Sequence, residues 1–183
     1  MDVNRFVAVQ QGNELLGNIS DANAAAFLTR TRDIHPLNAV SSTTRAPYTT
    51  TLSVSSDGTN WSPLLGELRA LRTADGASQN YYGVAKVSYS SGVAGIGYIG
   101  APVAMGWDYL PSASEVMAHE LGHQYGLPHE PRGASTGSPF HPSMMNYDYS
   151  YQLNGKGEDG KDMKMMFPGG MPPAGMPMHG MPG

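Results

Sequence analysis

One short stretch, MAHELGHQYGLPHEP at residues 117–131, constrains the fold of this chain more than any other. His119 and His123 are four residues apart, so an α-helix would place them on one face, about one turn apart. If the helix continued, His129 would point away from that face. Gly126 can adopt the left-handed conformation that ends a helix. The sequence therefore predicts a helix, a glycine turn and a third histidine that returns toward the first two.

Three neutral imidazoles that converge can bind one zinc ion (Zn²⁺) and leave its fourth position open to water, as in catalytic zinc sites. The chain has no cysteine, so a closed site built from thiolates is excluded. Zinc lowers the pKa of bound water to about 7, and a carboxylate beside the first histidine could take the proton of that water. The predicted site residues are the metal ligands His119, His123 and His129 and the general base Glu120.

The letters H-E-L-G-H-Q-Y-G-L-P-H, which begin at His119, resemble the extended zinc signature of the metzincin metalloproteases. Downstream, HPSMMNYDYSYQ resembles the Met-turn of that family, with matching positions Ser143, Met145 and Tyr147. The resemblance implies an α+β, zincin-like fold with a twisted mixed sheet, an active-site helix and a Met-turn. It also implies that Tyr147 hydrogen-bonds the oxyanion or ligates zinc, while packing beside the Met-turn is the alternative role of this residue.

Upstream, GIGYIGAP (residues 95–102) is similar to the edge strand that precedes the zinc helix in adamalysin-like metzincins. The wider segment up to the zinc helix is similar to secreted bacterial metzincins, some of which cleave mucins. Glu130, which follows the third histidine, and Tyr147 resemble the astacins, whose disulfides this cysteine-free chain cannot form. The resemblance therefore indicates the superfamily and leaves the subfamily open.

Hydrophobic periodicity predicts further strands and helices before the zinc helix. A leucine stripe follows Ser62, a candidate N-cap, and Pro63 at the first helical position, and Gly76 would end this helix. The glycines of residues 95–105 indicate close approach by another backbone, a bulge, or pairing with an extended peptide. The predicted strands are residues 5–10, 38–54, 81–89 and 95–105, and the other predicted helix is residues 21–32.

The composition changes near Asn154. Residues 154–183 hold eight glycines, five prolines and seven of the twelve methionines, a composition that cannot bury a core. The methionine spacing leaves copper(I) binding open as a minor alternative, since thioethers are soft ligands. We therefore predict a metzincin-like catalytic domain at residues 1–153, followed by a disordered Gly/Met/Pro-rich tail at residues 154–183.

Charge and hydropathy exclude several classes of partner. The net charge of −4 is mild, with 14% charged residues, and indicates no nucleic-acid partner. No apolar run approaches the roughly 18 residues that a membrane-spanning helix needs. The start, MDVNRFVAVQ, shows no secretory signal peptide, whereas the family resemblance implies a secreted, extracellular protein. We expect a monomer that acts on a protein or peptide substrate.

Together these motifs predict a zinc metalloendopeptidase, in which Glu120 activates a zinc-bound water that attacks a peptide bond. One alternative is a catalytically inactive metzincin-like binding module, and another is a truncated fragment that folds poorly. The intact Glu120 argues against a binding module, because binding alone needs no general base. No motif in the chain predicts the cleavage specificity.

Overall fold

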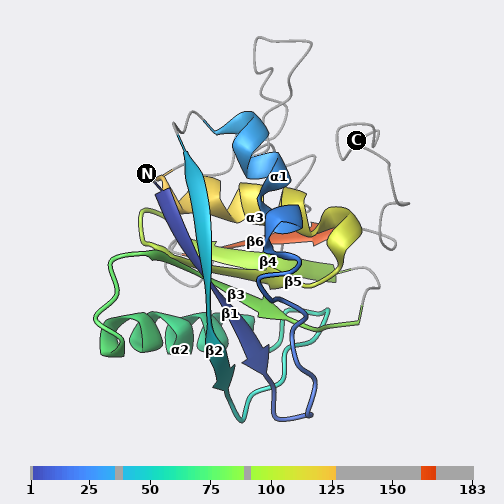
Figure 1. Cartoon of the computed structure of the whole chain (residues 1–183). Coiled ribbons are helices and arrows are strands. Elements are labelled where there is room, and N and C mark those ends of the chain that lie inside the picture. The colour runs from blue at the N-terminus through green and yellow to red at the C-terminus, as the bar shows by residue number, and fades with distance from the viewer. Residues whose placement is uncertain (1, 36–38, 89–91, 127–161, 168–183) are drawn as a thin grey trace.

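Figure 1 shows a computed structural model of the protein, which describes residues 2–35, 39–88, 92–126 and 162–167. The strands in these residues are β1 (Asp2–Gln10), β2 (Val40–Thr49), β3 (Asn80–Ala85), β4 (Gly92–Tyr98), β5 (Val103–Trp107) and β6 (Asp162–Phe167). The helices are α1 (Ala24–Ile34), α2 (Trp61–Ala74) and α3 (Leu110–Gln124). The predicted α+β class is confirmed, and the architecture is compatible with a protease domain.

All six strands belong to one mixed sheet with the order β2-β1-β3-β5-β4-β6. Three neighbouring pairs are parallel: β2 with β1, β1 with β3, and β3 with β5. The strand β4 is antiparallel to both of its neighbours, β5 and β6. Pro47 lies in β2 at the outer edge of the sheet, next to a shift in the register between β1 and β2. Such a position tolerates proline because its missing N–H would not be needed in the ladder.

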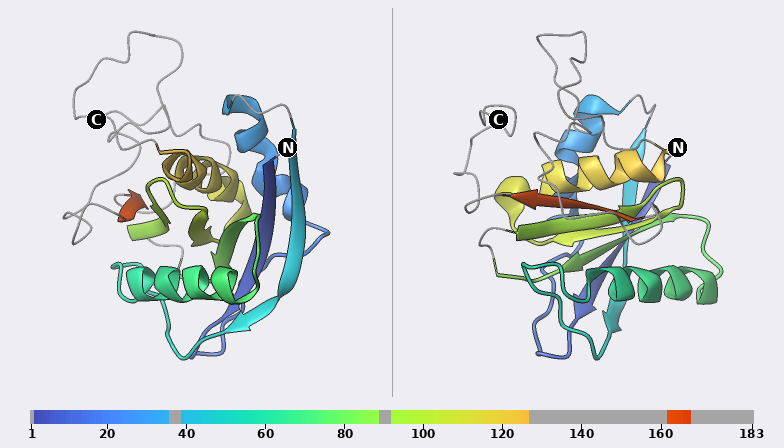
Figure 2. Two further views of the ribbon diagram at one scale, coloured as in Figure 1. Left: turned by 90° about the vertical axis from the view of Figure 1, so that its left-hand side faces the viewer. Right: turned by 180° about the vertical axis from the view of Figure 1, so that it is seen from behind.

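The two faces of the sheet are covered by different helices. α2 packs on one face, and α1 and α3 pack together on the opposite face (Figure 2). The large buried side chains on the α2 side are Trp61, Leu64, Leu65, Leu68, Tyr81 and Trp107. Those on the α1 and α3 side are Phe6, Phe27, Leu28, Tyr82, Met117 and Leu121. The predicted leucine stripe of α2 is therefore buried, except that its last member, Leu71, is partly buried.

Several predicted element boundaries were wrong. α2 begins at Trp61 after Asn60, so Ser62 lies inside the helix and is not its N-cap. Residues 95–105, predicted as one strand, form parts of β4 and β5, which are antiparallel. Gly100 has a φ of 73° between these two strands. A left-handed residue of this kind is typical of a turn and suits glycine, so the glycine that was assigned to a strand instead marks a reversal of the chain.

β6 was not predicted, because it lies inside the segment that was expected to be disordered. It pairs with β4 along the side that β5 leaves open (Figure 2). The structure therefore departs from the disorder prediction at Asp162–Phe167, and β4 is not the outermost strand of the described sheet. Strand pairing uses backbone N–H and C=O groups, which nearly every residue has. The amino-acid composition of this segment therefore does not predict whether it pairs with another strand. Residues 154–161 and 168–183 lie outside the described residues, so the domain boundary stays a prediction.

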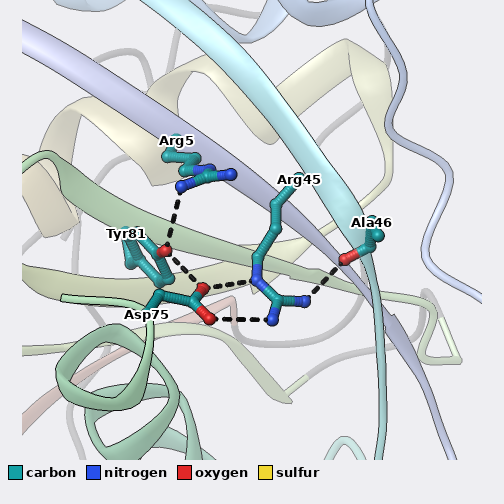
Figure 3. A network of polar contacts seen from close by, with 5 residues as sticks. All are labelled: Arg5, Arg45, Ala46, Asp75 and Tyr81. Carbon is teal, nitrogen blue, oxygen red and sulfur yellow. Dashed lines mark hydrogen bonds and ion pairs between the residues drawn. The ribbon is translucent and has the colours of Figure 1, made fainter. Parts of the chain in front are cut away.

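A polar network connects the elements at the α2 side of the sheet (Figure 3). Arg45 of β2 makes a bidentate ion pair with Asp75, with N–O distances of 2.5 and 3.0 Å. The Tyr81 hydroxyl of β3 donates a hydrogen bond of 2.6 Å to the same carboxylate and accepts one of 3.4 Å from Arg5. These contacts hold the pKa of Asp75 at about 2, because the hydrogen bonds from Arg45 and Tyr81 stabilise its ionised form. The network thus ties the end of α2 to three strands.

Candidate active site

The central motif lies on α3, the helix that packs against β4 and β5. Pro111 lies in its first turn, where the missing N–H is not needed. Gly126 follows the end of the helix with a φ of 89°, and its N–H donates to the His123 carbonyl at 2.9 Å. A residue with a Cβ is strained in this conformation, so the predicted helix and glycine turn are confirmed.

Contacts from two other parts of the chain hold α3 in place. The N–H of Gly100, in the turn between β4 and β5, donates to the carbonyl of His123 at 2.7 Å. The Nε2 atom of His35, directly after α1, lies 2.8 Å from the carbonyl oxygen of Ala118. Its ring also contacts Tyr125 edge to face, with a centroid distance of 5.2 Å. His35 therefore has a structural role beside the helix that carries the motif.

His119 and His123 are fully buried and point their Nε2 atoms at each other, 3.1 Å apart. Their rings are nearly perpendicular, with centroids separated by 4.7 Å. Two nitrogen ligands of a tetrahedral zinc ion, each at about 2.0–2.1 Å, would be separated by about 3.4 Å. The histidine pair therefore fits two ligand positions of one zinc ion.

The third predicted ligand, His129, lies outside the described residues. Within residues 2–35, 39–88, 92–126 and 162–167, no group of three or more His, Cys, Asp or Glu side chains could hold a metal ion. The predicted Met-turn residues Ser143, Met145 and Tyr147, together with Glu130, also lie outside this part of the chain. The structure thus brings two of the three predicted ligands together, and the third stays a prediction.

Glu120 is fully buried, and its carboxylate faces β4. A Cβ added to Gly95 would be 2.8 Å from Oε1, and one added to Gly97 would be 3.0 Å from Oε2. Neither carboxylate oxygen has a hydrogen-bond partner among the described residues. Burial raises the pKa of Glu120 well above its ordinary value, because the ionised form loses its hydration. An unpaired buried carboxylate is costly, and such groups are concentrated at functional sites.

The glycines of β4 and β5 explain how α3 approaches the sheet so closely. Gly95 is the register partner of Gly106, and a Cβ on either glycine would be within 3.0 Å of Val116 Cγ1. A Cβ on Gly97 would be 3.2 Å from the backbone oxygen of Glu120. Of the roles that the sequence left open for these glycines, the structure shows close approach by another backbone at Gly97 and an irregular register with β6 at Gly95.

Tyr82 is a neighbour of this site that the sequence did not reveal. Its hydroxyl would be 2.2 Å from a Cβ on Gly106, and it has no hydrogen-bond partner among the described residues. Burial raises its pKa well above the ordinary value, and the charge of Glu120 adds to the effect. The preceding residue, Tyr81, faces the opposite side of the sheet, because successive side chains of a strand point to opposite faces. The sequence does not reveal which of the two tyrosines faces α3.

Comparison with known proteins supports a peptidase. Residues 67–154 match the family model for peptidase M66, a match that extends from α2 through α3 to the end of the predicted Met-turn segment. No curated protein matches the chain. The match supports a metallopeptidase family and therefore a peptide substrate, and metal dependence is general among such peptidases. None of the described helices combines the length and the apolar character needed to cross a bilayer.

Proposed function

We propose that this protein is a zinc-dependent endopeptidase whose active site lies where α3 packs on β4. One observation carries the proposal: two buried imidazoles converge within 3.1 Å, and the residue between them in the motif is a buried carboxylate without a partner. A histidine pair that served only packing would not require a desolvated Glu120 beside it. The peptidase M66 match over residues 67–154, a range that includes this motif, supports peptidase activity.

The chemistry of the donor set suits zinc, which accepts neutral imidazole nitrogens as ligands. His119 and His123 would hold the metal through Nε2, and the sequence motif supplies His129 as the third ligand. When bound, zinc supplies Lewis-acid chemistry that favours ionisation of water near neutral pH and polarises a peptide carbonyl. The fold supports a metzincin type in one respect, since an antiparallel strand, β4, lies against the motif helix.

Glu120 would move the proton in this reaction. Its carboxylate would accept a proton from the attacking water and then donate that proton to the leaving amine, which must be protonated before it departs. Burial raises the pKa of Glu120 above its ordinary value, and a more basic carboxylate takes up a proton from water more readily. The packing against Gly95 and Gly97 would hold the carboxylate in position, so that little rearrangement is needed between the two transfers.

The substrate would be an extended peptide, and we propose that the enzyme acts outside the cell as a monomer. Main-chain pairing with β4 would orient the peptide, because an extended segment can add to a sheet through backbone hydrogen bonds. The low net charge of −4 supports neither a nucleic-acid partner nor strong electrostatic selection of substrates.

The decisive experiment is Glu120→Gln, which preserves size and removes basicity. The variant should bind one zinc ion per chain and fold normally, while peptide hydrolysis falls by about 10²–10⁴-fold. Glu115→Gln is the matched control, because this residue lies on the same helix, is only partly buried and does not belong to the motif. Zinc content and kcat/KM of the three proteins should be measured together. Wild-type turnover by Glu120→Gln would refute the assignment of Glu120, and absence of peptidase activity in the wild type would refute the proposed function.

A further inference from the structure

The edge of β4 that faces away from β5 binds another strand of the same chain. Residues Asp162–Phe167 form β6, which is antiparallel to β4 from Tyr98 to Gly92. The register is irregular only between Val93 and Gly95. β4 thus has β5 on one side and β6 on the other, and α3 contacts both β4 and β6 (Figures 1 and 2).

The register places β6 beside the candidate active site. Gly95 pairs with Met165, Ile96 with Lys164 and Gly97 with Met163. Gly95 and Gly97 are also the two residues against which the Glu120 carboxylate packs. The backbone of β6 therefore runs along the part of β4 that lies next to the proposed general base.

A peptide substrate that adds to β4 would need the same edge. Each backbone N–H and C=O group along this edge of β4 can pair with only one neighbouring strand, so pairing with β6 and pairing with substrate exclude each other. A strand in the same chain also pairs intramolecularly, which gives it the advantage of a high effective concentration over a separate peptide. We infer that Asp162–Phe167 is an intramolecular occupant of the substrate-binding edge, and that it must leave β4 before an extended peptide can bind.

This inference rests on the proposed function and adds a form of autoinhibition, in which β6 competes with the substrate for β4. The occupant lowers the fraction of molecules that can bind substrate, so the apparent KM increases by the inverse of that fraction. A free fraction of about one tenth would raise KM about tenfold and leave kcat unchanged. A signal that releases β6, such as cleavage of the tail or a partner that binds it, would then activate the enzyme.

The test uses the full-length chain with the double substitution Lys164→Pro and Met165→Pro. Two adjacent prolines remove consecutive backbone N–H groups and are incompatible with a paired strand. The matched control is Ala174→Pro with Gly175→Pro, which adds two prolines to the same Gly/Met/Pro-rich segment outside β6. Peptide hydrolysis and backbone hydrogen exchange should be measured on all three proteins.

We expect the β6 variant to have a several-fold to tenfold lower KM with unchanged kcat, and faster exchange at residues 92–98 and 162–167. The control should match the wild type. A synthetic peptide spanning residues 161–168 should inhibit the β6 variant competitively. If all three proteins hydrolyse peptides with equal KM values, or if the amides at residues 162–167 exchange freely in the wild type, the inference that β6 occupies the substrate-binding edge is refuted and the proposed function stands. Absence of hydrolysis in all three proteins would instead overturn the proposed function, and the inference with it.

Discussion

Two polar regions of this protein lie on opposite sides of one sheet and differ in how their charges are satisfied. On the α2 side, Asp75 receives hydrogen bonds from Arg45 and Tyr81, and its pKa is held at about 2. On the α3 side, Glu120 is buried without a hydrogen-bond partner among the described residues, and its pKa is raised. A partnered carboxylate stabilises the fold, whereas an unpartnered one costs stability. The comparison indicates a structural role for the first network, and the unpartnered carboxylate agrees with the general base that we propose for Glu120.

The largest expected effect is at the histidine pair. His123→Ala removes one of two Nε2 atoms that lie 3.1 Å apart, so zinc affinity and peptide hydrolysis should both be lost. Asp75→Ala should leave zinc stoichiometry unchanged, because the described contacts of Asp75 lie on the opposite side of the sheet from the histidine pair. Elemental analysis after titration of the metal-free proteins checks both results. Equal zinc binding by His123→Ala and wild type would contradict the assignment of the metal ligands.

The next effect concerns the glycines that let α3 approach the sheet. In Gly95→Ala, the new Cβ would be 2.6 Å from Val116 Cγ1 and 2.8 Å from Glu120 Oε1, so the helix or the carboxylate must move. We expect a loss of about 1–3 kcal/mol in the free energy of unfolding, together with reduced hydrolysis.

Gly66→Ala on α2 is the matched control for this substitution. Its Cβ would meet only the Tyr98 hydroxyl, at 3.8 Å, and alanine in a helix is about 0.5–1 kcal/mol better than glycine. Chemical denaturation should therefore show opposite changes in the two variants. A Gly95→Ala protein as stable and active as the wild type would show that the close packing is unimportant.

A smaller effect should distinguish the adjacent tyrosines of β3. Tyr81→Phe removes the 2.6 Å hydrogen bond to Asp75 and should cost about 1 kcal/mol. Tyr82→Phe removes a buried hydroxyl that has no partner in the described structure, so its stability should stay within about 0.5 kcal/mol of the wild type or increase. Urea denaturation of both variants gives the comparison directly. A larger loss in Tyr82→Phe than in Tyr81→Phe would indicate a partner for the Tyr82 hydroxyl.

The smallest effect is a pH dependence of opposite sign in the two regions. The pKa of Asp75 is lowered from 3.8 to about 2, so its stabilising contribution is present above 3.8 and is lost as the pH falls toward 2. The pKa of Glu120 is raised from 4.5, so the folded state holds its proton longer than the unfolded state. The metal-free protein should therefore lose stability as the pH rises above about 4.5.

Substitution separates the two contributions to this pH dependence. Asp75→Asn should flatten the acid side of the stability curve, and Glu120→Gln should flatten the side above pH 4.5. Thermal melts of metal-free protein across this pH range test both assignments. Curves that Glu120→Gln leaves unchanged would show that its carboxylate is hydrated in the folded protein.

The sequence by itself determined the local features of this protein. The four-residue spacing of His119 and His123 predicts that their imidazoles share one face of a helix, and the structure brings their Nε2 atoms together. Gly126 ends that helix, and the leucine stripe of α2 is buried, as their spacing predicts. These features could be predicted because helix periodicity and glycine conformation depend on residues within a few positions of one another.

Only the tertiary structure decided which distant residues meet. The contact of Glu120 with Gly95 and Gly97, the position of Tyr82 over Gly106, and the pairing of β6 with β4 all join segments far apart in the chain. No local pattern contains this information, because strand pairing uses main-chain groups common to nearly every residue. The choice of partner depends on the packing of the whole sheet and its helices, and that packing placed the buried carboxylate against a glycine surface.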